Sequence, residues 1–369
     1  MTQMRRLATE ILAATLVTGL IASASAQPPL QLAPAAPAPP KAAPARAAPS
    51  KPPRNEPAHA LPAPPTAAAA AAAAAPPAPA ASRQEPDLAY GAYQRGYYMT
   101  AFAIATRRAS EQNDAKAMAL LGELYSNGFG IERDEKKAAE WYRLAADRGD
   151  REAMFALALM HLSGRAGSVD RERGAKLLAA AAKLGHAAAA YDLGLLYLEG
   201  QSFPQDFSRA AELFRSAAET GNPEAQYALA TLYKEGRGVP KDPAEAARLL
   251  AAASLADNTD AQVEYAIALF NGTGVARNEA AAAALLRKAA RKGNAIAQNR
   301  LANVLAVGRG VPADPVAALK WHIVAKAGGV SDIPLDSFAE KQSAELRAAA
   351  EKAAKPWLDA IREARESHS

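Results

Sequence analysis

The side chains that could carry out chemistry in this 369-residue chain are few and widely spaced. Cysteine is absent, which excludes disulfides, thiolate metal sites and cysteine nucleophiles. No phosphate-binding loop, paired-histidine zinc helix or nucleophile elbow is present. The histidines, which never fall at metal-ligand spacing, are His59, His161, His186, His322 and His368. The sequence therefore predicts no catalytic residue, no metal site and no cofactor, and we do not expect an enzyme.

The feature that must position the remaining side chains is a repeat of 36 residues. One column of the repeat is always glycine, at Gly128, Gly164, Gly200, Gly236, Gly272 and Gly308. A second column is glycine with one exception, at Gly149, Gly185, Gly221, Asp257, Gly293 and Gly329. A fixed period of this length is typical of a solenoid, in which similar units stack in a row.

Each unit predicts two antiparallel helices, a first helix A and a second helix B. In the first unit, helix A is expected over about 115–127, and Gly128 should end it in a left-handed cap. Asp134 should cap helix B, as should its counterparts Asp170, Asp206, Asp242, Asn278 and Asp314. The residues expected to cap the following A helices are Asp150, Asn222, Asn258 and Asn294.

Alanine columns predict that the helices lie close together. One runs through Ala117, Ala153, Ala189, Ala225, Ala261 and Ala297, and the other through Ala145, Ala181, Ala217, Ala253, Ala289 and Ala325. Larger residues are expected to fill the spaces between the helices. They are Leu121, Leu157, Leu193, Leu229 and Leu301 on helix A, and Trp141, Leu177, Leu213, Leu249, Leu285 and Trp321 on helix B.

The repeated run from Ala117 to Tyr125, followed by Gly128, Asp134, residues 137–142 and Gly149, resembles the Sel1-like repeat family. These repeats are relatives of the tetratricopeptide repeat. The resemblance covers six units over residues 115–330. It implies an all-α fold, a right-handed superhelical α-solenoid of stacked antiparallel helix pairs, in an exported bacterial protein.

The two ends of the repeat array depart from the pattern, as the ends of solenoids do. Residues 87–114 predict a shorter, tetratricopeptide-like hairpin that turns at Gly96. Residues 331–369 predict C-terminal capping helices, namely an amphipathic helix over 337–354 and a short last helix that begins at Pro356.

The first 86 residues predict export and a spacer. Residues 1–26 have a basic start, a short apolar core and a small-residue cleavage site after Ala26, which is typical of a cleaved signal peptide. A retained membrane anchor is the alternative, and the expected location is periplasmic or secreted. Residues 27–86 contain 18 of the 26 prolines, which predicts a disordered linker that serves as a tether or an inert spacer.

The distribution of charge bears on the partner. The formal net charge is +5, but residues 1–86 carry most of it and residues 87–369 are close to neutral. A nucleic-acid partner is therefore not expected. No segment after the signal is apolar and long enough to span a bilayer.

The candidate binding residues are those that vary between units at the inward positions of helix A. The resemblance to tetratricopeptide stacks implies that helix A lines the concave face of the solenoid. The candidates are Phe155, Leu159, Tyr191, Leu195, Tyr227, Thr231, Lys234, Ile267 and Phe270. An apolar groove with a polar rim is typical of a peptide-binding surface, with Phe155, Tyr191 and Tyr227 as anchors. The alternative is that these side chains are buried against neighbouring helices.

Three functions fit these observations. The first is an exported, non-enzymatic scaffold that binds a protein or peptide in the groove. The second, implied by exported members of the family such as ExoR-type repressors, is a periplasmic regulator of a membrane sensor kinase. The third is a cell-wall factor that associates with peptidoglycan.

Overall fold

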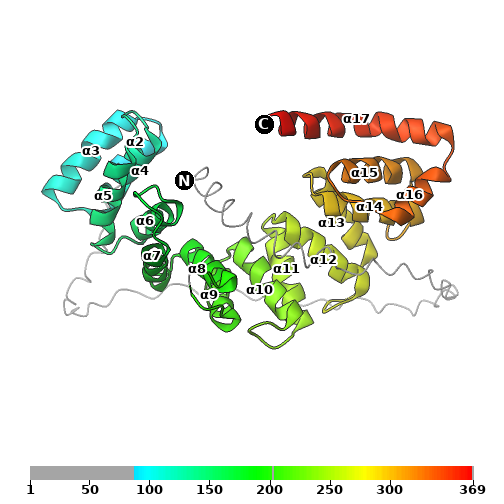
Figure 1. Cartoon of the computed structure of the whole chain (residues 1–369), viewed down its shortest axis with the longest axis horizontal. Helices are drawn as coiled ribbons and strands as arrows, with labels where there is room; N and C mark the ends of the chain where they lie inside the picture. Colours follow the sequence, from blue (N-terminus) through cyan, green and yellow to red (C-terminus); the bar gives the residue numbers. More distant parts are fainter. Residues whose placement is uncertain (1–86, 202, 368–369) are drawn as a thin grey trace, which may run out of the picture. The chain divides into compact units, whose positions relative to one another are not determined.

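The computed structural model describes residues 87–201 and 203–367, and every regular element in these ranges is an α-helix. The predicted signal peptide and proline-rich linker lie outside the described residues. Helices that are consecutive in the sequence lie against each other in antiparallel pairs, so the prediction of an all-α solenoid of stacked helix pairs is confirmed (Figure 1). The right-handed superhelical twist stays a prediction.

Six units of two helices each follow a short first hairpin. The A helices are α4 (Ala115–Asn127), α6 (Arg151–Ser163), α8 (Ala187–Glu199), α10 (Pro223–Glu235), α12 (Thr259–Asn271) and α14 (Ala295–Val307). The B helices are α5 (Glu135–Ala146), α7 (Arg171–Lys183), α9 (Phe207–Glu219), α11 (Pro243–Leu255), α13 (Glu279–Arg291) and α15 (Pro315–Ala327). In the described part of the chain, no helix is both long and apolar enough to cross a membrane.

The predicted helix ends are confirmed residue by residue. The first glycine column adopts the left-handed conformation in all six units, with φ between 69° and 77°. All the predicted aspartate and asparagine caps accept a backbone N–H with their side chains. Asp257, the exception in the second glycine column, keeps a φ of 71°. The caps fix where each helix begins, and hence which face it presents to its neighbours.

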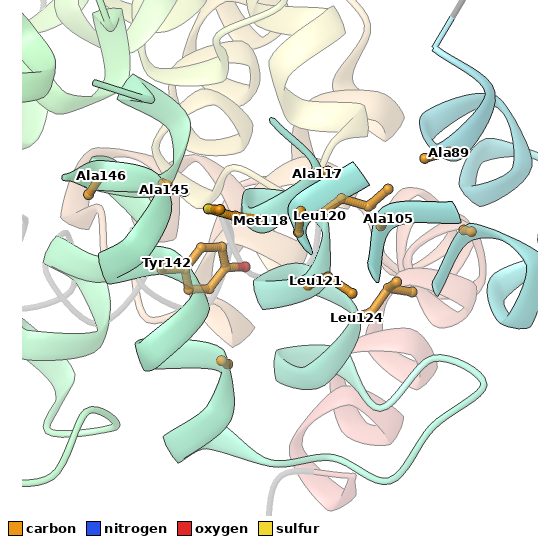
Figure 2. Packing of buried hydrophobic residues seen from close by; sticks show 14 of the residues in the cluster. Ala89, Ala105, Ala117, Met118, Leu120, Leu121, Leu124, Tyr142, Ala145 and Ala146 are labelled. Atoms are coloured by element: carbon orange, nitrogen blue, oxygen red, sulfur yellow. The ribbon is translucent and has the colours of Figure 1, made fainter. Parts of the chain in front are cut away.

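Alanine lets the helices approach closely, as predicted. Both alanine columns are at most 3% exposed in every unit. In unit 1 these small side chains lie beside Met118, Leu121 and Tyr142 in one buried cluster (Figure 2). Each helix pair is too thin to enclose such a core alone, so the stacking of neighbours stabilises it.

In four of the six units, the deepest large side chain of helix B is one residue later than predicted. Trp141, Leu177, Leu213 and Leu285 are only half-buried, whereas Leu249 and Trp321 are buried as predicted, at 3% and 6% exposure. The column that is buried in every unit is the next one, Tyr142, Leu178, Phe214, Leu250, Leu286 and His322, at most 5% exposed. Which of two adjacent large residues points inward depends on the rotation of helix B against helix A, and the repeat pattern alone does not specify this angle.

A size match between two columns explains two of the glycines inside helix A. Gly122 faces Tyr142, and Gly194 faces Phe214; a Cβ on either glycine would lie 2.6–2.7 Å from the aromatic ring. In the units where leucine or histidine replaces the aromatic residue, alanine occupies the glycine position. The pairs are Ala158 with Leu178, Ala230 with Leu250, Ala266 with Leu286, and Ala302 with His322.

This size match predicts that Gly194→Ala destabilises the protein and that a second substitution rescues it. The new methyl group overlaps the Phe214 ring, and overpacking of this kind costs about 1–3 kcal/mol. Adding Phe214→Leu recreates the alanine–leucine pair of other units, so the double variant should recover most of the loss. Urea unfolding of both single variants and the double variant measures the coupling between the two positions.

Gly91→Ala serves as the matched control. Gly91 also lies inside a helix, but a Cβ there would meet only the end of Arg95 at 3.8 Å. Alanine favours a helix interior over glycine by about 1 kcal/mol, so this variant should not be destabilised. An unchanged stability in Gly194→Ala would show that the core has room for the methyl group and would contradict the size match.

A second glycine in the loop between helix A and helix B brings successive units together. Gly238, Gly274 and Gly310 lie against the first residues of the preceding unit's helix B, namely Phe207, Pro243 and Glu279. Their φ values are 69–70°, and no side-chain atom separates the two backbones. This close approach sets the spacing between one unit and the next.

The ends of the solenoid are built differently. At the N-terminus, α2 (Leu88–Gln94) and α3 (Tyr98–Glu111) form a hairpin, with Gly96 at a φ of 81° between them. At the C-terminus, α16 (Ile333–Glu340) lies against α14 and α15, and α17 (Ala344–Glu366) lies against α15.

The prediction of a helix break at Pro356 is wrong. The break comes earlier, at residues 341–343, where Ser343 caps the start of α17, and Pro356 lies inside this 23-residue helix. Proline removes one backbone hydrogen bond from a helix interior. Contacts before and after Pro356 hold α17 against α15. Ala350 and Ala354 are buried, and the ring centroids of Trp357 and Trp321 lie 4.9 Å apart.

Candidate partner-binding surface

The nine predicted binding residues lie on the A helices of units 2 to 5, but they differ in burial. Phe155, Leu195 and Phe270 are buried, at 8%, 4% and 2% exposure. The others are half-buried, namely Leu159, Tyr191, Tyr227, Thr231, Lys234 and Ile267. The buried three have no free surface to offer a partner, so the residues that can contact one are the half-buried six.

Two of the buried aromatic residues make contacts between units. Phe155 stacks on the ring of His186, with the two ring centroids 4.3 Å apart. The guanidinium of Arg309 lies 5.7 Å from the centre of the Phe270 ring. His186 is the cap of α8, the first helix of unit 3, and Arg309 lies in unit 6, so these contacts contribute to the stacking of successive units.

Tyr191 and Tyr227 combine an apolar ring with a hydroxyl group that stays protonated. The centroids of the Tyr191 and Phe214 rings lie 5.6 Å apart, and this contact holds the Tyr191 ring in place. Burial raises the pKa of both tyrosines, and the nearby carboxyl groups of Asp192 and Glu264 raise the pKa of Tyr191 and Tyr227, respectively. Both hydroxyls are therefore neutral at physiological pH and can donate or accept a hydrogen bond.

Two charged residues of the A helices, Glu264 in unit 5 and Arg300 in unit 6, were not predicted as part of the site. Lys234 donates to Glu264 of the next unit over 3.0 Å. Arg300, in the same column as Glu264 one unit further on, is half-buried and makes no hydrogen bond or ion pair among the described residues. Burial lowers the pKa of the Arg300 guanidinium. The sequence could have indicated Glu264 and Arg300, since their column changes from alanine in unit 4 to glutamate in unit 5 and arginine in unit 6.

Asp192 lies in this column in unit 3 and is the most unusual carboxyl group of the surface. It is 5% exposed and makes no hydrogen bond or ion pair within the described ranges. Burial raises the pKa of the Asp192 carboxyl to about 7. A charged carboxylate at this place is costly, so the group is partly protonated near neutral pH.

The polar residues at the two ends of the predicted groove bind the end helices. The hydroxyl of Tyr93 in α2 donates to Glu123 over 2.8 Å. The side-chain amides of Asn299 and Asn303 donate to Asp332, the cap of α16, over 3.0 and 2.9 Å. Against the effect of burial, the two amides lower the pKa of Asp332. Units 1 and 6 are therefore polar where the end helices dock.

The buried histidines have structural partners. His186 is the cap of α8: its Nδ1 accepts the N–H of Ala189, and its Nε2 lies 3.2 Å from Glu152. His322 Nε2 lies 2.9 Å from Asp336 of α16. A polar cavity of about 250 Å³ lies beside His186, and its lining side chains Arg151 and Glu152 also have partners.

Across the described ranges, histidine and acidic side chains form no group of three that could hold a metal ion. Along the half-buried helix-A residues, the structure offers aromatic and aliphatic contact area, neutral hydroxyls and charged groups. Such an arrangement suits the binding of another molecule.

The 36-residue units match the Sel1 repeat model six times in succession, at residues 115–150, 151–186, 187–222, 223–258, 259–294 and 295–330. The chain therefore belongs to the Sel1 repeat family. Sel1 repeat proteins are generally non-catalytic helical scaffolds, and their solenoids typically mediate interactions between proteins.

Two solved structures with the same fold show how far the likeness extends. A Sel1 repeat protein from Oxalobacter formigenes is 28% identical, with a TM-score of 0.58, and the match covers 65% of this chain and 98% of that one. The protein c5321, a protective antigen of uropathogenic Escherichia coli with the SLR fold, is 27% identical with a TM-score of 0.51. That match covers 71% of this chain and 64% of c5321. No curated protein matches the chain.

Proposed function

We propose that this protein is an exported, non-enzymatic scaffold that binds a protein or peptide along the A helices of units 3 to 5. The binding surface consists of Tyr191, Tyr227, Thr231, Lys234 and Ile267. The observation that carries the proposal is that these varied side chains lie half-buried at corresponding positions of successive A helices. The typical role of Sel1 repeat solenoids as interaction scaffolds supports it.

The surface has the composition of a binding site. Aromatic residues that combine a large apolar ring with a hydroxyl are enriched at the energetic centres of protein interfaces. Arg300, on the A helix of unit 6, makes no hydrogen bond or ion pair among the described residues. It therefore adds hydrogen-bond donors beside the surface. Export is supported by the pattern of residues 1–26, and a mature chain that begins at Gln27 by intact-mass measurement would establish it.

Thr231 is the position at which the surface can be tested with least damage to the fold. Among the described residues, its hydroxyl donates only to the carbonyl of Tyr227 on the same helix. A photo-crosslinking amino acid at position 231 is expected to capture the partner in living cells, and mass spectrometry identifies it. Thr231→Arg should then weaken binding of the identified partner by about tenfold or more, because it places bulk and charge at the centre of the surface.

The matched control is Glu212 on α9, a helix B residue that is exposed. A crosslinker at position 212 is expected to give no adduct, and Glu212→Arg should leave binding unchanged. Equal adducts from both positions, or full binding by Thr231→Arg, would place the partner elsewhere on the solenoid.

A further inference from the structure

An exposed aromatic surface lies at the N-terminal end of the solenoid, far in sequence from the proposed partner-binding surface. We call it the aromatic patch and define it as Tyr90, Tyr97, Met99 and Phe129. Their exposed fractions are 43%, 62%, 61% and 37%, respectively. The other exposed large hydrophobic residues of the described ranges are scattered along the chain, apart from Leu88 beside the patch. Clustered exposed apolar side chains mark interaction sites more often than scattered ones do.

Two of the three rings of the patch, Tyr90 and Phe129, are held in a defined arrangement by Tyr93 and Tyr98 beneath them. Tyr90 is stacked with Tyr93 at 6.1 Å, and Tyr98 with Phe129 at 4.8 Å, with interplanar angles of 21° and 20°. Tyr93 and Tyr98 join the two pairs, with their centroids 5.7 Å apart. The hydrogen bond from Tyr93 to Glu123 fixes the centre of this group to α4. The rings of Tyr90 and Phe129 are therefore preorganised.

The chemistry that fits such a surface is a proline-rich peptide in the polyproline II conformation. This conformation has three residues per turn and no internal hydrogen bonds, so its prolines stack on aromatic rings and its carbonyls remain free to accept from tyrosine hydroxyls. The chain itself carries this chemistry. Residues 27–86 contain the spacing Pro-x-x-Pro five times, at 34/37, 37/40, 49/52, 62/65 and 76/79.

We propose that the aromatic patch binds the proline-rich segment, residues 27–86, of a second copy of this chain. The segment ends at residue 86, two residues before α2 begins. The proline content of residues 27–86 predicts a semi-rigid spacer of about 3.1 Å per residue, so we expect most of its Pro-x-x-Pro motifs to lie beyond the reach of the patch of their own chain. We therefore expect these motifs to bind the patch of a neighbouring copy. This inference does not depend on the proposed partner-binding surface of units 3 to 5.

Each copy then supplies one ligand and one receptor, which gives a heterologous contact. Such a contact closes into a reciprocal dimer or continues into a longer chain of copies. The unmodified full chain, purified from the cells that make it, is expected to show a mass that rises with concentration in sedimentation equilibrium.

Two variants and their mixture test the proposal. The patch variant carries Tyr90→Ser and Tyr97→Ser, and the ligand variant carries serine at the nine prolines of the Pro-x-x-Pro motifs. Each variant alone should be monomeric where the unmodified chain associates. Mixed together they should form a complex that contains both variants, because the first still supplies the proline-rich segment and the second still supplies a patch. Recovery on mixing shows that neither variant has lost its fold.

Leu255→Ser is the matched control, because Leu255 is 88% exposed on a different helix. This variant should associate like the unmodified chain. A full chain that stays monomeric to its solubility limit, as it would if the segment occupied the patch of its own molecule, would overturn the proposal. So would undiminished association of the patch variant, or a mixture that remains monomeric.

Discussion

Gly274→Ala is expected to destabilise the protein by about 2–5 kcal/mol, because it separates units 4 and 5. The left-handed backbone at this position costs a residue with a Cβ about 1–2 kcal/mol. In addition, the new Cβ would overlap the carbonyl oxygen of Pro243, well inside the 3.0 Å limit for real contacts. The loop or the start of α11 must move, and such overpacking costs about 1–3 kcal/mol more. Urea unfolding followed by circular dichroism measures the loss.

Gly272→Ala separates the two contributions. Gly272 lies in the same loop with a φ of 70°, and its added Cβ would meet its nearest neighbour at an ordinary 3.5 Å. It should therefore show the backbone cost alone. Equal losses in the two variants would mean that the overlap with Pro243 is relieved without cost, and that Gly274 does not set the spacing between units.

Unit 2 shows what the solenoid does without this glycine. Ala166 occupies the column of Gly274, and the left-handed φ passes to Gly167, at 128°. The neighbouring Arg165 instead reaches back to Glu135 and to Ser126, at 2.7 Å and 3.0 Å. A side-chain contact replaces the direct approach of two backbones, so the spacing between units 1 and 2 is set by different chemistry.

The features that could be predicted from the sequence are those that each residue determines locally. A glycine that ends a helix needs only its own positive φ, and a capping aspartate needs only the first turn that follows it. This is why the roles of Gly128 and Asp134, and of their counterparts in the other five units, were predicted correctly. His186 is the exception, because its ring nitrogen takes the capping role that aspartate or asparagine has in the other units.

The features that could not be predicted depend on how units are placed against each other. Glu264 pairs with Lys234 across 30 residues, and this register is a property of the stack rather than of either helix. The burial of Phe155 and Phe270 likewise depends on other parts of the stack, namely His186 at the start of α8 and Arg309 of unit 6. The sequence predicted the columns of helix A that vary, but not which members of those columns a neighbour covers.

Asp192→Asn is expected to stabilise the protein by up to about 4 kcal/mol at pH 8 and to leave its stability unchanged near pH 4. Burial raises the pKa of the Asp192 carboxyl from 3.8 to about 7 in the folded state. Between these values the folded protein binds a proton that the unfolded chain has released, so stability falls as the pH rises. Above pH 7 the carboxylate is charged in both states and the full cost remains. Asparagine has the same shape and no charge.

Asp257→Asn is the matched control, because its pH dependence has the opposite sign. Hydrogen bonds from Lys288 and Lys292, at 2.8 and 2.7 Å, hold the pKa of the Asp257 carboxyl well below its usual range. This stabilisation is present above the unfolded pKa and is lost as the pH falls through the folded pKa. Asp257→Asn should therefore lower stability at pH 7, with a difference that shrinks on acidification. Asparagine also tolerates the φ of 71°.

The two substitutions remove the same chemical group from the same protein, so a general effect of replacing aspartate cannot produce opposite pH profiles. Urea unfolding at several values between about pH 2 and pH 8 gives both profiles, because the Asp192 difference develops between about pH 4 and pH 7 and the Asp257 difference is lost only below about pH 4. Parallel curves for the unmodified protein and Asp192→Asn would show that the Asp192 carboxyl has the same pKa in the folded and unfolded chains. The cost of burying the charged Asp192 carboxylate would then be offset by other interactions in the folded protein. Asp192 would differ in this respect from the destabilising buried acid that we infer.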